Sequence, residues 1–141
     1  MTLLQIYALT AIILGLKMSA ISVVQALSRT RSGVFVNPED ARTFGTTASA
    51  QENETVQRAA RAWRNDLENI PIFLILGWIY VSAGLSTTAF TAYCVIFVIA
   101  RIAHTILYLN AVQPLRTAAY AIGSGAILAM MIHLFVRVVL A

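Results

Sequence analysis

Four long, largely apolar segments leave few folds open to this chain. They occupy about residues 3–27, 56–84, 89–110 and 114–139, and roughly 20 helical residues are enough to cross a hydrocarbon core. Hydrophobic residues make up 59% of the sequence and charged residues 11%, whereas soluble domains carry about 25% charged residues. With a mean hydropathy of +0.76, the pattern predicts an all-α integral membrane protein. We expect one domain, residues 1–141, folded as a four-helix transmembrane bundle with up-down topology.

The polar connection at 28–56 indicates how the bundle is oriented. Within it, residues 37–40 read Asn-Pro-Glu-Asp, which predicts the start of a short helix with Asn as N-cap and Pro in the first turn. In an up-down bundle this loop and the turn at 110–114 share one end, and both termini share the other. Only Arg137 is basic near the terminal end, so the positive-inside rule predicts a cytoplasmic loop 28–56.

The stretch 58–73 is charged at its start and apolar at its end, although it belongs to one predicted helix. Four polar residues fall within an arc of about 100° on that helix: Arg61, Arg64, Asn65 and Glu68. No charge follows over residues 70–85. Charged groups are costly near hydrocarbon and tend to mark functional sites. The stretch therefore predicts a polar pocket for a small, multiply charged molecule where lipid meets water.

Two further polar stripes are predicted at the same end of the bundle. The third segment carries four polar residues on one helical face: Arg101, His104, Thr105 and Tyr108. The fourth segment carries Arg116 and Tyr120 one turn apart near its start. Arg116 at a helix start opposes the helix dipole, which favours a role other than capping. We therefore expect all three stripes to face one pocket.

Buried cations in this bundle need partners. Arg101 would lie about 20 Å along its helix, still inside the hydrocarbon, so an acidic partner is expected, and Asp66 or Glu68 could reach it. Lys17 interrupts the first apolar segment. It either snorkels toward the membrane surface or faces the interior of the bundle.

These residue types by themselves indicate an anionic ligand at a membrane interface. Guanidinium groups bind carboxylates, and Glu68 could bind an ammonium group. Glutathione carries two carboxylates, one ammonium, peptide amides and a thiol, so it fits this set. Its thiol attacks only as the thiolate, and a free thiol has a pKa of about 8.5. A neighbouring guanidinium would favour the anion.

Other ligand classes fit the sequence less well. The basic residues sit beside or within apolar segments and alternate with acids, so no nucleic-acid partner is expected. Cys94 is the only cysteine, which excludes an intrachain disulfide and a thiolate metal cluster. No two-histidine ligand spacing occurs, and no metal is expected.

Four segments resemble the family of membrane-associated proteins in eicosanoid and glutathione metabolism (MAPEG). They are Phe-Val-Asn-Pro-Glu-Asp-Ala (35–41), Arg-Ala-Trp-Arg-Asn-Asp-Leu-Glu-Asn-Ile (61–70), Arg-Ile-Ala-His-Thr-Ile-Leu-Tyr-Leu (101–109) and Gln-Pro-Leu-Arg (113–116). Together with similar helix spacing they cover nearly the whole chain. The resemblance implies a homotrimer in the lipid bilayer, with three glutathione sites between neighbouring subunits that face the cytoplasm.

The resemblance also implies roles for individual residues. Those that resemble glutathione contacts within one subunit are Arg64, Asn65, Glu68, His104, Tyr108, Arg116 and Tyr120. Arg116 resembles the arginine credited with stabilising the thiolate, and Arg29 resembles a contact donated to the neighbouring pocket. Residues that resemble supporting ion pairs are Arg61, Asp66 and Arg101. Asp40 matches an acid implicated in prostaglandin isomerisation by family members.

Three positions depart from the family pattern. Pro71 lies one residue earlier after Glu68 than in relatives. Trp63 replaces a histidine that is common in relatives, and Thr117 stands where prostaglandin-forming members have a serine proposed to act in catalysis. We predict a glutathione S-transferase that conjugates apolar electrophiles from the membrane and reduces lipid hydroperoxides. The alternatives are a glutathione-dependent isomerase of a lipid endoperoxide, with Asp40 and Thr117 at the second-substrate site, or a non-catalytic scaffold that binds lipid or a partner. A small exporter is disfavoured, because its coupling carboxylate should lie in the middle of the membrane. All six acids of this chain lie within 39–68.

Overall fold

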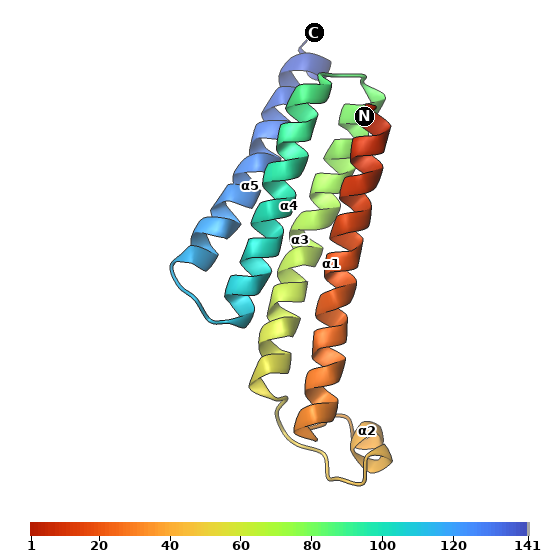
Figure 1. Ribbon diagram of the computed structural model, residues 1–141, viewed down its shortest axis with the longest axis vertical. Helices are drawn as coiled ribbons and strands as arrows, with labels where there is room; N and C mark the ends of the chain where they lie inside the picture. The colour runs from red at the N-terminus through yellow and green to blue at the C-terminus, as the bar shows by residue number, and fades with distance from the viewer. Residues whose placement is uncertain (141) are drawn as a thin grey trace.

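The computed structural model describes residues 1–140, in which four long helices run alternately up and down (Figure 1). The long helices are α1 (Leu3–Ser32), α3 (Glu54–Ser82), α4 (Thr87–Leu109) and α5 (Leu115–Leu134), and a π-helical turn, η1 (Phe135–Val139), extends the last of them. A short helix, α2 (Pro38–Thr43), lies in the connection between α1 and α3. Within residues 1–140 there is no strand, so the prediction of an all-α chain is confirmed.

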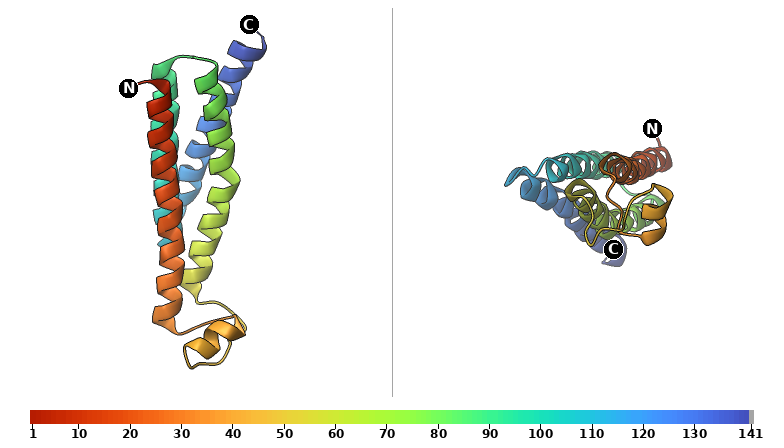
Figure 2. Two further views of the ribbon diagram at one scale, coloured as in Figure 1. Left: turned by 90° about the vertical axis from the view of Figure 1, so that its right-hand side faces the viewer. Right: turned by 90° about the horizontal axis from the view of Figure 1, so that it is seen from below.

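Helices α3 and α4 each pack against the other three long helices of the bundle (Figures 1 and 2). The middle of the core is a stacked pair of rings, Phe73 of α3 and Phe97 of α4, whose centroids are 3.9 Å apart. Leu14 of α1 and Met130 of α5 are fully buried in the same apolar cluster. All four long helices therefore contribute to one hydrophobic core.

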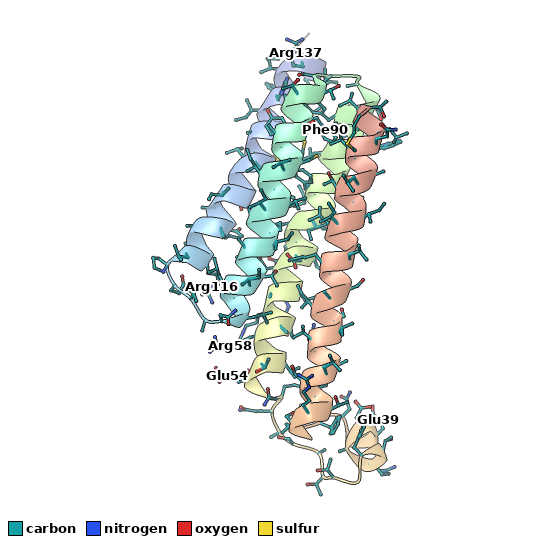
Figure 3. All side chains as sticks on the ribbon, in the orientation of Figure 1. Glu39, Glu54, Arg58, Phe90, Arg116 and Arg137 are labelled. Carbon is teal, nitrogen blue, oxygen red and sulfur yellow. The ribbon has the colours of Figure 1, made fainter. Side chains whose placement is uncertain are left out.

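The two ends of the bundle differ in chemistry. Both termini lie at one end, and α2 and the α4–α5 turn lie toward the other, where α1 and α3 reach beyond that turn (Figures 1 and 2). Figure 3 shows Glu54 and Arg58 at this extended end of α3, Arg116 at the start of α5, and Arg137 at the far end. Arg58 donates to Glu54 one turn away, and this hydrogen bond holds the pKa of the Glu54 carboxyl below its usual value.

Helix α1 is longer than predicted and the loop after it is correspondingly shorter. The helix continues past residue 27 to Ser32 and ends at Gly33, whose φ of 64° is a left-handed C-cap. Arg29 and Arg31 in its last turn interact favourably with the negative end of the helix dipole. Their polarity suggested a loop, but charged residues extend a helix readily once it leaves the apolar layer.

Helix α2 begins where the sequence predicted a helix start. Asn37 is the N-cap residue and Pro38 occupies the first turn. The Asn37 side chain makes no capping bond, and its amide nitrogen donates instead to Asp40 Oδ2 at 3.0 Å. Around the helix, the rings of Phe35 and Phe44 stack with centroids 4.7 Å apart, which closes this segment on itself.

Three helical segments are long and apolar enough to cross a membrane: Leu3–Ser32, Thr87–Leu109 and Leu115–Val139. Helix α3, the fourth predicted span, does not meet that composition, because its first half carries the polar stripe. It packs lengthwise against the other three nevertheless. The polar half of α3 thus enters an otherwise apolar bundle.

Candidate functional site

A buried ionic cluster joins three helices at the polar half of α3. Asp66 of α3 and Arg101 of α4 are both completely buried, and Asp66 Oδ1 accepts from Arg101 Nη2 at 2.9 Å and from Nε at 3.3 Å. Lys17 of α1 donates to the other oxygen, Asp66 Oδ2. Arg101 Nη2 also donates to Asn65 Oδ1. The cluster therefore consists of Lys17, Asp66, Arg101 and Asn65, with two cations for one carboxylate.

The structure selects between alternatives that the sequence left open. The partner of Arg101 is Asp66, while Glu68 is exposed. Lys17 does not snorkel to the membrane surface but turns into the bundle, where its side chain is 9% exposed. Removing two cations from water is tolerable only with close partners, and Asp66 is the acid that both of them share.

A second group of side chains gathers between α4 and α5 around His104. The centroid of the His104 ring is 5.6 Å from that of Tyr108 and 6.2 Å from that of Tyr120. Arg116 lies over the face of Tyr108, with its guanidinium carbon 4.4 Å from the ring centroid. We call these four residues the aromatic–arginine group. It brings together four residues that the sequence predicted as glutathione contacts.

The ionic cluster and the aromatic–arginine group are adjacent along α4. Arg101 and His104 are one helical turn apart and both buried. Three buried polar atoms on this face have no hydrogen-bond partner within residues 1–140: Arg101 Nη1, His104 Nδ1 and Thr105 Oγ1. Buried polar groups normally bond to protein, water or ligand. Thr105 was not among the predicted site residues, although its place one turn from Arg101 was a usable signal.

Helix α5 approaches this face closely at Gly123. A Cβ atom added there would lie 3.5 Å from Arg101 Cδ and 3.6 Å from Ala100 Cβ. Gly123, in the run of small residues 123–126, thus permits close packing of α5 on α4. Gly125 differs, because no atom lies within 4 Å of its added Cβ.

The remaining predicted residues on α3 belong to neither group. Arg61, Arg64 and Glu68 are exposed, and none of the three forms an ion pair with another residue of the described chain. The predicted ion-pair role of Arg61 therefore has no counterpart within residues 1–140. Arg64 and Glu68 are one turn apart, so a cation and a carboxylate stand free on the same helical face.

Arg29 is engaged within its own chain. Its Nε donates to Glu52 Oε1 at 2.8 Å, and its Nη2 lies 2.8 Å from the same oxygen. Trp63, the residue that replaces the family histidine, lines a cavity of about 250 Å³ beside Arg29. Glu52 was not predicted as a site residue, since it lies in the polar connection with no periodic pattern around it.

The two candidate second-substrate residues lie in different places. Thr117 Oγ1 is 3.0 Å from the side chain of Gln113, whose amide can turn its oxygen to Arg116 while its nitrogen donates to Thr117. Asp40 belongs to α2, and Figure 3 shows its neighbour Glu39 on the opposite side of the molecule from Arg116. One chain therefore does not bring Asp40 to the aromatic–arginine group.

A mainly apolar hollow lies elsewhere. A cavity of about 330 Å³ between α1 and α4 has Cys94 and Thr10 in its wall. None of the predicted glutathione contacts lines it. Within residues 1–140 no group of three or more His, Cys, Asp or Glu side chains could hold a metal ion. The chemistry available at the polar end rests on arginine, amide, imidazole and phenol groups.

Comparison of the sequence with known proteins gives matches over most of the chain. Microsomal glutathione S-transferase 1 of Rattus norvegicus is 41% identical over 125 residues, which cover 85% of this chain and 81% of that protein. The Bos taurus protein of the same name is 40% identical over 126 residues, 86% and 81% of the two chains. Prostaglandin E synthase of Homo sapiens is 32% identical over 117 residues, 82% and 77% of the two chains. The sequence pattern of the MAPEG family matches residues 7–136, and the chain belongs to that family.

Proposed function

We propose that this protein is a membrane glutathione S-transferase that joins the glutathione thiolate to apolar electrophiles. The observation that carries the proposal is the aromatic–arginine group, in which Arg116 stands beside Tyr108 at the polar end of the bundle. The relatives named as microsomal glutathione S-transferases, at about 41% identity, support the same class of reaction.

In this proposal each polar residue meets a different part of the tripeptide. The Arg116 guanidinium faces the sulfur and stabilises the thiolate, because a nearby cation favours the anionic form. Arg64 binds a carboxylate and Glu68 binds the ammonium group. Hydrogen bonds from Asn65, His104 and Tyr120 align the peptide. Positioning the sulfur and lowering its pKa are then achieved by one set of contacts.

The site is completed by a neighbouring subunit in a homotrimer. Arg64 and Glu68 are exposed in the single chain, as expected for residues that bind a ligand at a subunit boundary. Arg29 lies on α1 at the same end and is proposed to reach the neighbouring pocket. The site faces the cytoplasm, where glutathione enters, and the electrophile arrives from the lipid between helices of adjacent subunits.

The conjugation is a substitution at carbon. The thiolate sulfur attacks the electrophilic carbon, the carbon–sulfur bond forms, and the leaving group departs with its bonding electrons as an anion. With a lipid hydroperoxide the same thiolate attacks the terminal peroxide oxygen, so the lipid alcohol and a glutathione sulfenic acid form. A second glutathione then gives the disulfide and water.

The test is the ultraviolet absorbance of the thiolate when glutathione is added to purified protein at neutral pH. Wild type should form the thiolate, Arg116→Ala should not, and Arg137→Ala at the other end of the bundle should behave as wild type (Figure 3). Normal thiolate formation in Arg116→Ala would remove Arg116 from its role. Absence of glutathione-dependent turnover over a broad panel of aromatic electrophiles and hydroperoxides would favour a non-catalytic scaffold.

A second candidate is isomerisation of a lipid endoperoxide with glutathione, favoured by the relatives named prostaglandin E synthase. It would place Asp40 and Thr117 at the product-forming step. Thr117 is hydrogen-bonded to Gln113, and Asp40 would have to come from a neighbouring subunit. Incubation with a lipid endoperoxide and glutathione, followed by product analysis, distinguishes the transferase from the isomerase. A rearranged ketone formed without loss of glutathione identifies the isomerase.

A further inference from the structure

The two oxygens of Asp66 have separate partners. Oδ1 receives both Nε and Nη2 of Arg101, at 3.3 and 2.9 Å, while Oδ2 receives only the ammonium of Lys17. Arginine and carboxylate usually pair through two parallel hydrogen bonds, one to each oxygen. Here Arg101 makes both of its bonds to Oδ1, while Lys17 holds Oδ2.

Arg101 also reaches a third residue. Its Nη2 carries two protons and donates to both Asp66 Oδ1 and Asn65 Oδ1. Arg101 is completely buried, and Gly123 of α5 allows close packing against its side chain. The guanidinium is therefore held between Asp66 and Asn65.

This contact determines which end of the Asn65 amide is free. The oxygen and nitrogen of an asparagine amide are nearly the same size, so the neighbours decide its orientation. A guanidinium has only donors and requires the oxygen. The Asn65 Nδ2 group makes no hydrogen bond to another described residue and belongs to a half-buried side chain. Asn65 thus keeps two donors without a partner in residues 1–140.

We infer that Lys17 is a positioning residue that acts through Asp66 and Arg101 to hold the Asn65 amide with its donors toward the peptide co-substrate. The inference rests on the proposed glutathione site. The group that Asn65 meets is an acceptor oxygen of the tripeptide, either a carboxylate or a peptide carbonyl. Lys17 itself touches no substrate, and its influence is on binding rather than on the reacting sulfur.

The decisive experiment compares Lys17→Met with Lys17→Gln by titrating each purified full-length protein with glutathione. Methionine leaves Oδ2 without a donor, so the guanidinium shifts toward a bidentate pair with Asp66 and Nη2 moves off Asn65 Oδ1. The dissociation constant for glutathione should then rise about tenfold, the value of one charge-assisted hydrogen bond. Glutamine can still donate to Oδ2 without charge and should bind within about threefold of wild type. Similar weakening of glutathione binding in both variants would show that the affinity depends on the charge of Lys17 and not on a donor at Asp66 Oδ2.

A double-mutant cycle with Asn65→Leu tests the proposed route. If Lys17 acts through Asn65, the double variant Lys17→Met/Asn65→Leu should bind glutathione no more weakly than Asn65→Leu alone. The inference would be overturned if the two substitutions multiplied their effects on the dissociation constant for glutathione, or if Lys17→Met left that constant unchanged. The transferase proposal would stand in either case. Wild-type protein that fails to bind glutathione would overturn both.

The kinetic signature separates positioning from general damage. Since thiolate stabilisation is assigned to Arg116, Lys17→Met should raise KM for glutathione and leave kcat within about twofold. Its thermal unfolding should stay near that of wild type, because removal of one of two cations leaves Asp66 and Arg101 as a neutral pair. A fall in kcat with unchanged KM would contradict a binding role.

Discussion

The guanidinium carbon of Arg116 lies 4.4 Å from the centroid of the Tyr108 ring. This contact spans the turn between α4 and α5, so it ties the end of one helix to the start of the next. A cation over an aromatic face is stabilised without a carboxylate. The positive charge of Arg116 is therefore held in place but not neutralised, as a residue that binds an anion requires.

Tyr108→Leu should weaken thiolate formation at neutral pH by about tenfold, because loss of the ring removes the cation–π contact that fixes Arg116. Tyr108→Phe is the matched control, since it keeps the ring and loses only the hydroxyl. The measurement is thiolate absorbance at saturating glutathione. Equal loss of thiolate absorbance in both variants would assign the effect to the Tyr108 hydroxyl and not to the cation–π contact.

Asp66→Ala should destabilise the protein by about 3–5 kcal/mol, because it leaves Lys17 and Arg101 buried with no anion. The triple change Lys17→Met, Asp66→Leu and Arg101→Met should recover most of that loss. Thermal unfolding in detergent measures both effects. Glu54→Ala, which removes only an exposed pair with Arg58, serves as the control and should leave the unfolding temperature unchanged.

Gly123→Ala should be neutral or stabilising by up to about 1 kcal/mol, since alanine is the better helix former. The added Cβ would sit at ordinary contact distance, 3.5 Å, from Arg101 Cδ. Gly123→Leu should cost about 1–3 kcal/mol because the larger side chain pushes α4 and α5 apart. Unfolding temperatures decide the matter: a strongly destabilised alanine variant would mean that the helices require the bare backbone.

Glu52→Gln should lower KM for glutathione a few-fold, because it frees Arg29, which Glu52 now holds at 2.8 Å. Arg29→Ala should raise KM by a similar factor if Arg29 reaches a bound carboxylate. Steady-state kinetics at low salt provide the measurement. An unchanged KM in both variants would leave Arg29 as a structural residue that anchors the loop after α1.

His133→Leu should lower stability by about 1–2 kcal/mol, the worth of a lost hydrogen bond at a half-buried site. Nδ1 of His133 lies 3.1 Å from the Tyr93 hydroxyl and 3.3 Å from that of Tyr80. Glutathione affinity should not change, because this group is at the end of the bundle that carries the termini. A shift in the glutathione dissociation constant would show that the two ends are coupled.

Much of the fold followed from local pattern. Apolar runs of sufficient length predicted the helices, and Asn37-Pro38 predicted the start of α2, because hydropathy and capping depend on neighbouring residues. The end of α1 was placed too early, since Arg29 and Arg31 look like loop residues although they favour a helix C-terminus. The polar face shared by Arg101, His104 and Tyr108 also followed from periodicity alone.

The sequence by itself determined that Arg101 needs an acid and that two acids on the neighbouring helix were within reach. Only the tertiary structure decided that Asp66 is the partner and that Lys17 shares it. The physical reason is rotation about the helix axis. Asp66 and Glu68 are two residues apart, about 200° around α3, so packing against α1 and α4 buries one and leaves the other exposed. That rotation depends on contacts among helices far apart in the chain, which no local pattern contains.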